Sequence, residues 1–333
     1  MVELFPDIHA FCAHVSGLFV KEIKIRAIDQ TSEEGSKLIA AYLEGGLSHF
    51  NADGNTSNDQ ECKTDYDSLP VGTLLLLSLE QLACGASLIE CMAAASVPST
   101  LAKCLYIFLD LPPSESSELS KSRLLFQRKF TGILQKICVS AFAAEELVQA
   151  DALRHLFSAS VDPCSSENAC WRRNSCKILT TLAQNCLTPL VIQYIHDSSC
   201  IAECIENLRQ MRLPKADGVE TFTSLFHVLS ESSRSSTQLL DDFHACGGYS
   251  TLTEYLLKYD ESLRNIRAVD CLQATFLRAR SALLCTALLE CVKEIFERSP
   301  GNYFVLDKHH LISSITETIP SKPDCVQVSS SSR

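Results

Sequence analysis

The sequence predicts an all-α protein whose helices stack side by side as a solenoid, and three observations support this fold class. Apolar residues recur at the spacing of one helix face along almost the whole chain. Strict alternation of apolar and polar residues, the pattern of a half-buried strand, is not evident. At 333 residues, the chain exceeds the size at which one compact core usually stops growing, so an extended array of helices is favoured over a single bundle.

The helical stripes can be followed in order along the chain. The first clear stripe comprises Leu101, Cys104, Leu105, Phe108 and Leu109, which share one face of a helix. The stripes that follow are Phe126, Phe130, Ile133 and Ile137; Ile201, Cys204, Ile205 and Leu208; Leu252, Tyr255, Leu256 and Tyr259; and Leu284, Leu288, Cys291, Val292 and Ile295. Each stripe predicts a helix with one buried face.

Helix boundaries agree with these stripes. Pro70, Pro98 and Pro189 each stand where a helix should open, because proline suits the first helical turn. Thr188 is the expected N-cap of the helix that Pro189 opens. Gly247-Gly248 is expected to form a turn between two stripes. Together these signals predict about fifteen helices of about 10–20 residues with short connections.

The chain divides into four predicted segments. Residues 1–45 form the amino-terminal helices of the array, and residues 46–68, rich in Gly, Asn, Asp and Ser, form a polar loop. Residues 69–319 form the main helical array, and residues 320–333 form a disordered tail that closes on four serines. A search for a fixed period of 34 to 47 residues finds no clean recurring signature. The prediction is therefore an armadillo- or HEAT-like solenoid with degenerate repeats.

Composition excludes several classes of protein. Hydrophobic residues make up 46% of the chain and charged residues 21%, which is too apolar for a disordered chain. The net charge of -11 argues against nucleic acid as a partner, because that partner requires positive potential. No secretory signal is evident, and the 17 cysteines are odd in number, so reduced thiols and a cytoplasmic location are expected.

The cysteines supply two candidate metal sites. His196, Cys200 and Cys204 lie four residues apart and would share one face of a continuous helix. However, zinc usually takes ligands from separate elements, often as close CxxC pairs, which do not occur here. Burial of these cysteines in the core is the favoured interpretation. A second group, Cys164, Cys170 and Cys176, matches no common zinc spacing and is also interpreted as core or loop thiols.

Signatures of catalysis and of cofactor binding are missing from the sequence. There is no Gly-x-Ser-x-Gly nucleophile elbow. Neither Gly-x-Gly-x-x-Gly nor Gly-x-x-x-x-Gly-Lys, the loops that bind phosphate, occurs anywhere. The chain is therefore expected to be no enzyme and to hold no cofactor.

Two surface candidates for partner or lipid contact remain. Lys21, Lys24 and Arg26 form a basic cluster in the first helix, but lipid recognition usually takes a denser cluster, and a solvated helix face is favoured. Trp171, Arg172 and Arg173 combine residue types that are common at binding hot spots. Equally, Trp171 could be core with both arginines in solvent.

Several strings resemble the amino-terminal region of the autophagy-linked FYVE protein family, which are large scaffolds with BEACH and WD40 domains. The most specific strings run from Ser96 to Leu101, from Lys103 to Tyr106 and from Asp110 to Pro112. Others include Leu239 to Phe243 and Asn302 to Phe304. They occur in the family's order and cover about residues 10–322. A departure falls near Asp260 to Arg264, where relatives have a longer stretch.

The resemblance implies an armadillo-like array that acts as a scaffold segment in selective autophagy of aggregated protein. Its partners would be autophagy or membrane-traffic proteins, with membrane contact made through domains that this sequence does not contain. The chain would then be a fragment, and none of the family's known functional residues can be carried over to it. Two alternatives stay open: a membrane-surface adaptor that uses Lys21, Lys24 and Arg26, and an all-α metal-binding protein that uses His196, Cys200 and Cys204.

Overall fold

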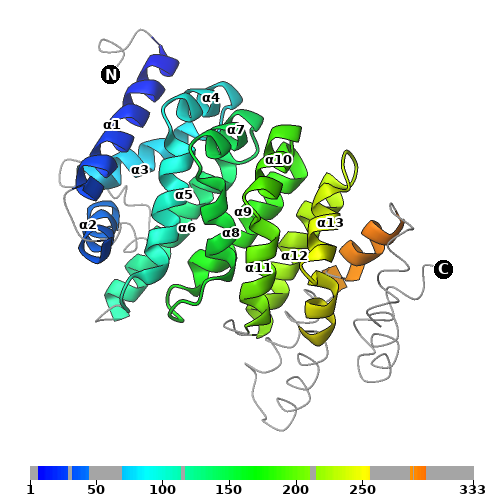
Figure 1. The fold of residues 1–333 in the computed structure, drawn as a ribbon. Coiled ribbons are helices and arrows are strands. Elements are labelled where there is room, and N and C mark those ends of the chain that lie inside the picture. Colours follow the sequence, from blue (N-terminus) through cyan, green and yellow to red (C-terminus); the bar gives the residue numbers. More distant parts are fainter. Residues whose placement is uncertain are drawn as a thin grey trace, which may run out of the picture. The chain divides into compact units, whose positions relative to one another are not determined.

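The computed structural model describes residues 7–28, 32–44, 70–113, 117–210, 215–255, 286–287 and 289–297. Within those ranges the chain is helical and has no strand, as predicted. The helices are α1 (Ile8–Ile28), α2 (Ser32–Glu44), α3 (Val71–Leu82), α4 (Ala86–Ala94), α5 (Val97–Ile107), the 3-10 helix η3 (Phe108–Asp110), α6 (Ser117–Ile137), α7 (Ala141–Gln149), α8 (Leu153–Val161), α9 (Ala169–Cys186), α10 (Pro189–Asp197), α11 (Cys200–Arg209), α12 (Lys215–Ser232) and α13 (Gln238–Ala245) (Figure 1). The predicted polar loop, the tail and the departure near Asp260 lie outside the described residues.

The chain forms two compact units. The first contains residues 1–159 and 164–186, and the second contains residues 160–163 and 187–333. In the first unit α3 packs on α6, α6 packs on α9, and α4 lies beside α7 (Figure 1). In the second unit α10 and α11 both pack on α13. The pairs α3–α6, α4–α7, α6–α9 and α10–α13 each join helices three places apart in the chain, which is the contact pattern of an armadillo-like stack of helix triplets.

The first helices of these triplets, α4, α7, α10 and α13, begin at residues 86, 141, 189 and 238, so the spacings are 55, 48 and 49 residues. Each is followed by a sharp turn around one left-handed residue. These are Ser96 (φ 62°), Asp151 (φ 50°), Ser199 (φ 52°) and Gly247 (φ 77°). The left-handed residue ends one helix and reverses the chain into the next.

The repeat has its own core positions. Four residues before each left-handed residue stands an apolar side chain with no solvent exposure: Met92, Leu147, Ile195 and Phe243. Five residues after the four left-handed residues stand Leu101, Leu156, Cys204 and Leu252, which are also fully buried. The repeat therefore exists in the sequence, but a search at one fixed period misses it because the spacing varies and the side chains share only their apolar character.

Local start signals are confirmed by the structure. Pro189 is the first residue of α10, and the Oγ1 of Thr188 accepts a hydrogen bond from the Val191 N–H at 3.4 Å. Pro70 immediately precedes α3, and Pro98 lies in the first turn of α5.

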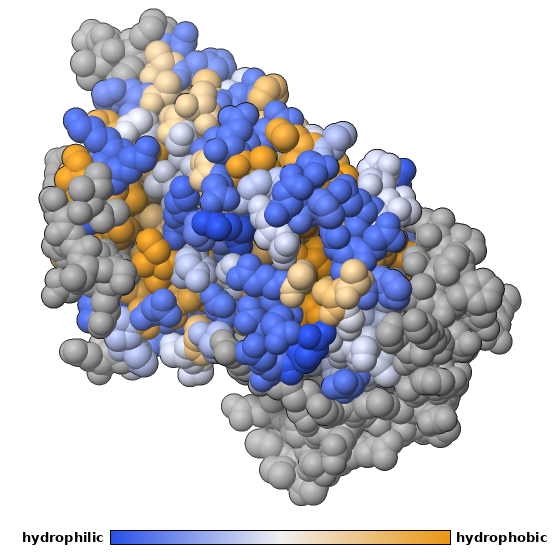
Figure 2. All heavy atoms as spheres, viewed as in Figure 1, coloured by the Kyte–Doolittle hydropathy of each residue, from blue (hydrophilic) through white to orange (hydrophobic). Residues whose placement is uncertain are grey.

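On the face drawn in Figure 2, hydrophobic side chains reach the surface in separate patches divided by hydrophilic ones.

Candidate functional site

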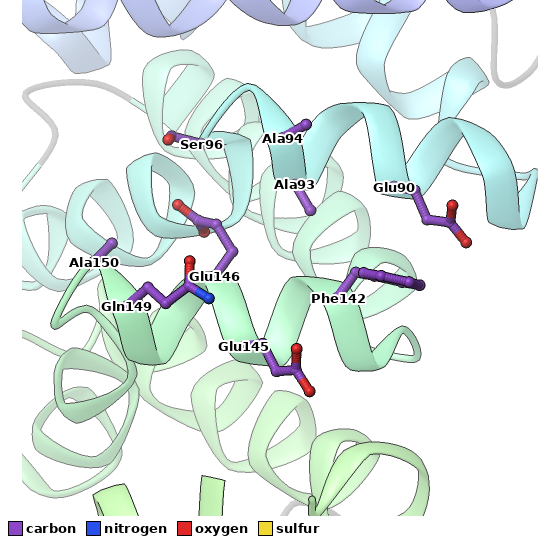
Figure 3. A pocket seen from close by; sticks show the side chains of 9 residues that line it. All are labelled: Glu90, Ala93, Ala94, Ser96, Phe142, Glu145, Glu146, Gln149 and Ala150. Carbon is purple, nitrogen blue, oxygen red and sulfur yellow. The ribbon is translucent and has the colours of Figure 1, made fainter. Parts of the chain in front are cut away.

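An open groove of about 450 Å³ lies between α4 and α7 in the first unit. Two consecutive repeats therefore supply its walls through equivalent helices. From α4 and the turn after it come Glu90, Ala93, Ala94 and Ser96. From α7 and its end come Phe142, Glu145, Glu146, Gln149 and Ala150. Figure 3 shows Glu90 and Phe142 at one end of the groove, and Ser96, Gln149 and Ala150 at the other.

Helix periodicity decides which side chains face this groove. In α7, Ala143, Ala144 and Leu147 are buried against the unit's core. This leaves Phe142 and Glu145, three residues apart, on one solvent-facing stripe. Phe142 is 58% exposed, although phenylalanine is among the residues most often found inside proteins.

The carboxylates of the groove differ in what they bind. Glu146 accepts two hydrogen bonds from Ser99, one from the backbone N–H at 2.9 Å and one from the hydroxyl at 2.6 Å. Because Ser99 lies in the first turn of α5, Glu146 satisfies donors at that helix start and holds one repeat to the next. Its negative charge is therefore largely committed to the fold.

Glu90 and Glu145 are different, because neither forms an ion pair with any residue that the structure describes. Glu90 is exposed and Glu145 is half-buried. A cation does border the groove: the Nζ of Lys103 donates to the carbonyl of Ala150 at 3.0 Å. That contact lies at the far end of the groove from Glu90 and Phe142. The groove thus combines two available carboxylates, one exposed aromatic ring and a small-residue wall.

The predicted basic cluster on α1 is smaller than the sequence indicated. Lys21 and Lys24 are exposed. Arg26, however, is only partly exposed and has partners within the protein: its Nη1 lies 2.6 Å from the Oε2 of Glu22, and its guanidinium stacks 3.6 Å above the ring of Tyr42. Two lysines remain, fewer than the cluster of basic residues that anionic-lipid recognition usually requires.

The predicted contact surface at Trp171, Arg172 and Arg173 is wrong for its first two residues. Trp171 has no solvent exposure, and Arg172 is 2% exposed. The indole packs against three phenylalanine rings with centroid distances of 5.3 to 5.7 Å: Phe108, Phe126 and Phe130. The guanidinium of Arg172 donates to the Sγ of Cys164 at 3.2 Å. Arg173 alone of the three is partly accessible.

His196, Cys200 and Cys204 do not share a helix face. His196 lies in the last turn of α10, and Cys200 begins α11, because the left-handed Ser199 breaks the helix between them. Both cysteines are buried in the core. The Nδ1 of His196 instead lies 2.8 Å from the Oδ2 of Asp242 in α13, which holds the pKa of His196 above its ordinary value.

Metal-ligating side chains do not gather elsewhere in the described ranges: no group of three or more His, Cys, Asp or Glu could hold an ion there. Cys176 is buried, whereas Cys164 and Cys170 are partly accessible. The Sγ of Cys170 accepts a hydrogen bond from the Asn174 side chain at 3.3 Å. Burial of Cys176 and the hydrogen bond to Cys170 therefore agree with the interpretation of these cysteines as core or loop thiols.

No single helix among the described residues has the length and apolar character of a membrane span. The two segments Ala86–Ala94 and Val97–Asp110, taken together, do have that length and apolar character, but they are bent by 73° relative to each other.

Comparisons with known proteins reveal distant relatives. The WD repeat- and FYVE domain-containing protein 4 of Mus musculus is 24% identical over 363 residues, which cover 92% of this chain and 11% of the relative. The Homo sapiens protein of the same name is 24% identical over 294 residues, which cover 71% of this chain and 9% of the relative. The chain thus spans about a tenth of the length of these relatives. No protein-family model matches it.

Among solved structures, one similar chain is a designed armadillo repeat protein in complex with the peptide (KR)4. It has a TM-score of 0.40 and 13% sequence identity, and the match covers 83% of this chain and 91% of that one.

Proposed function

We propose that this chain is a non-enzymatic protein-interaction segment of a large BEACH-type scaffold. The observation that carries the proposal is the groove between α4 and α7, where an exposed Phe142 and two carboxylates that form no ion pair with the described residues line a concave surface. Concave surfaces between stacked repeats are the usual binding surfaces of solenoid proteins. Distant similarity to a WD repeat- and FYVE domain-containing protein supports the scaffold setting.

The finer role is selective autophagy of aggregated protein, with autophagy or membrane-traffic proteins as partners. Its support is the family resemblance of the sequence. The segment would work in the cytoplasm, peripheral to autophagic membranes when it is part of a full-length protein. Affinity capture from cytosol with wild-type and Phe142→Ser baits tests this role. Autophagy or traffic proteins should be depleted from the variant sample, and equal recovery with both baits contradicts the role.

Selection from a random peptide library tests the broader proposal directly. The full 333-residue chain is immobilised, and its fold is verified by circular dichroism. We expect enriched peptides that bind the wild type, bind a Leu124→Ser control equally well, and bind Phe142→Ser weakly. Leu124 is a suitable control because it is also an exposed apolar residue, 41% exposed on α6 of the same unit. Failure to enrich any peptide on folded bait contradicts the proposal.

A membrane-surface adaptor is the second candidate, and one observation favours it. The outer face of α1 exposes Leu18 (37%) and Ile25 (48%) beside Lys21 and Lys24. Apolar and basic side chains on one exposed helix face can bind an anionic interface. Flotation with phosphatidylserine vesicles decides it: a Lys21→Gln/Lys24→Gln variant should float less than the wild type, and no flotation of the wild type excludes this candidate.

A further inference from the structure

We propose that the groove between α4 and α7 binds an extended segment of a partner protein that presents lysine or arginine next to an apolar side chain. This inference rests on the proposed function and specifies the chemistry of the partner. Four properties of the groove carry it: its charge, its exposed aromatic ring, its small-residue wall and its size.

Charge favours a cationic occupant. Glu90 and Glu145 form no ion pair with the described residues, whereas Glu146 is occupied by Ser99. The whole chain carries a net charge of -11, so the surrounding potential adds to the local attraction. The same carboxylates repel phosphate, which argues against nucleic acid and anionic lipid at this groove.

The aromatic ring favours an apolar or basic side chain beside the charge. Phe142 is 58% exposed and stands at the same end of the groove as Glu90 (Figure 3). A lysine or arginine that pairs with Glu90 can lay its methylene stem or its cationic group against this ring. A neighbouring leucine would cover the rest of the ring and remove apolar surface from water.

The wall and the size favour an extended segment over a folded domain. Ala93 and Ala94 on α4 and Ala150 after α7 present no long side chains, so a partner's backbone can approach closely. A volume of about 450 Å³ lies in the range of sites that enclose a few side chains. A folded partner would instead need a contact area of about 800 Å² on each side.

Fluorescence anisotropy tests the inference with a short labelled lysine-rich peptide that carries a central leucine. The wild-type chain should bind it, and added salt should weaken binding because ionic contacts are screened. Glu90→Gln/Glu145→Gln should bind about tenfold more weakly, and Phe142→Ser should weaken binding by a similar factor. An analogue with glutamate in place of lysine should not bind.

Matched variants separate groove effects from general ones. Asp110→Asn/Glu206→Gln removes two carboxylates elsewhere, and Leu124→Ser removes an exposed apolar side chain outside the groove. Both should bind like the wild type, and circular dichroism should show that every variant is folded. Equal affinity of the groove variants and the wild type overturns the inference. So does equal binding of a neutral peptide, or self-association of the chain in sedimentation that Phe142→Ser abolishes.

These outcomes distinguish this inference from the proposed function. Library peptides that bind the chain but are neutral or acidic, or that bind independently of Glu90 and Glu145, contradict the inference and leave the scaffold proposal standing. A library that yields no binding peptide contradicts both.

Discussion

At the scale of single residues, the turn after α13 shows how tightly the repeat is built. Gly247 is left-handed, and Gly248 follows it without room for a side chain. A Cβ at Gly248 would lie 2.5 Å from the nearest ring carbon of Phe243, and that ring is fully buried. Neither the ring nor the backbone can move away cheaply, because the core around them is closely packed.

Gly248→Ala should therefore destabilise the second unit by about 1–3 kcal/mol, the usual cost of overpacking a core. Urea unfolding followed by circular dichroism measures the change. Gly132→Ala is the control, since a Cβ at Gly132 on α6 meets nothing within 4 Å. It should stabilise the chain by about 0.5–1 kcal/mol, because alanine favours a helix interior over glycine. Equal effects of the two substitutions would refute the packing argument.

The pair of His196 and Asp242 predicts a titration. The hydrogen bond to the Asp242 carboxylate is the main cause of the raised His196 pKa, and Asp197 adds to it. The stability that the pair contributes is present below the unfolded-state pKa of about 6.5. It is lost as the pH rises through the higher folded-state pKa.

Proton NMR of the imidazole signals measures this effect. Asp242→Asn should lower the pKa of His196, because an amide does not stabilise the imidazolium as a carboxylate does. His155 is an internal reference: its pKa is lowered by burial and should not respond to the substitution. An unchanged His196 titration in Asp242→Asn would show that the ion pair is not formed in solution.

At the scale of elements, neighbouring repeats are joined through the ends of their helices. Glu146 on α7 accepts both donors of Ser99 at the start of α5. In the second unit, Arg209 of α11 donates to the carbonyl of Cys246 after α13 at 2.7 Å. Lys103 makes the corresponding contact to Ala150 in the first unit. A cation from the second helix of one repeat thus reaches the end of the first helix of the next repeat, where the helix dipole is negative.

Glu146→Ala should cost about 1–2 kcal/mol, because it leaves the Ser99 N–H without its cap and removes a bond between repeats. Thermal unfolding compares it with Glu145→Ala, a change of the adjacent residue that faces the groove. Glu145→Ala should alter stability by less than about 0.5 kcal/mol, as expected for a surface substitution. A similar loss for both variants would argue against the role of Glu146 as a cap.

The sequence reveals local features of these elements and misses features that depend on tertiary structure. Thr188 and Pro189 announce the start of α10 because capping chemistry acts within one helical turn. The triplet repeat escapes detection because its left-handed position is filled by Ser, Asp, Ser and Gly in turn. The sequence allows Trp171 to be either a surface contact or core and predicts Arg172 at the surface; the three phenylalanines around the indole place Trp171 in the core, and Arg172 is buried beside it.

The candidate site illustrates the same limit. Glu90 and Phe142 are separated by a whole repeat in the sequence, so no local pattern brings them together. A usable signal does exist: Phe142 stands on the polar stripe of α7, beside Glu145, where an apolar ring has no structural reason to be. Aligning the repeats on their left-handed residues would have placed α4 and α7 in equivalent roles and shown that Glu90 and Glu145 occupy the same position.

At the scale of the whole molecule, the chain has an armadillo-like fold, and we propose that its groove binds partner proteins. In the part of the chain that is described, helix ends and turns hold the repeats together; of the acidic side chains in the groove, Glu146 takes part in this, whereas Glu90 and Glu145 form no ion pair there. Different substitutions should therefore change stability and binding. Changes at Glu146 and Gly248 should lower stability, whereas changes at Phe142, Glu90 and Glu145 should weaken binding.

Amide hydrogen exchange of the chain, with and without a peptide selected from the library, tests the central claim most directly. Peptide binding in the groove should slow exchange in residues 86–96 and 141–150 and leave α1 and α12 unchanged. Protection confined to other helices, or no protection at saturating peptide, would contradict the claim that this groove is where the chain binds its partners.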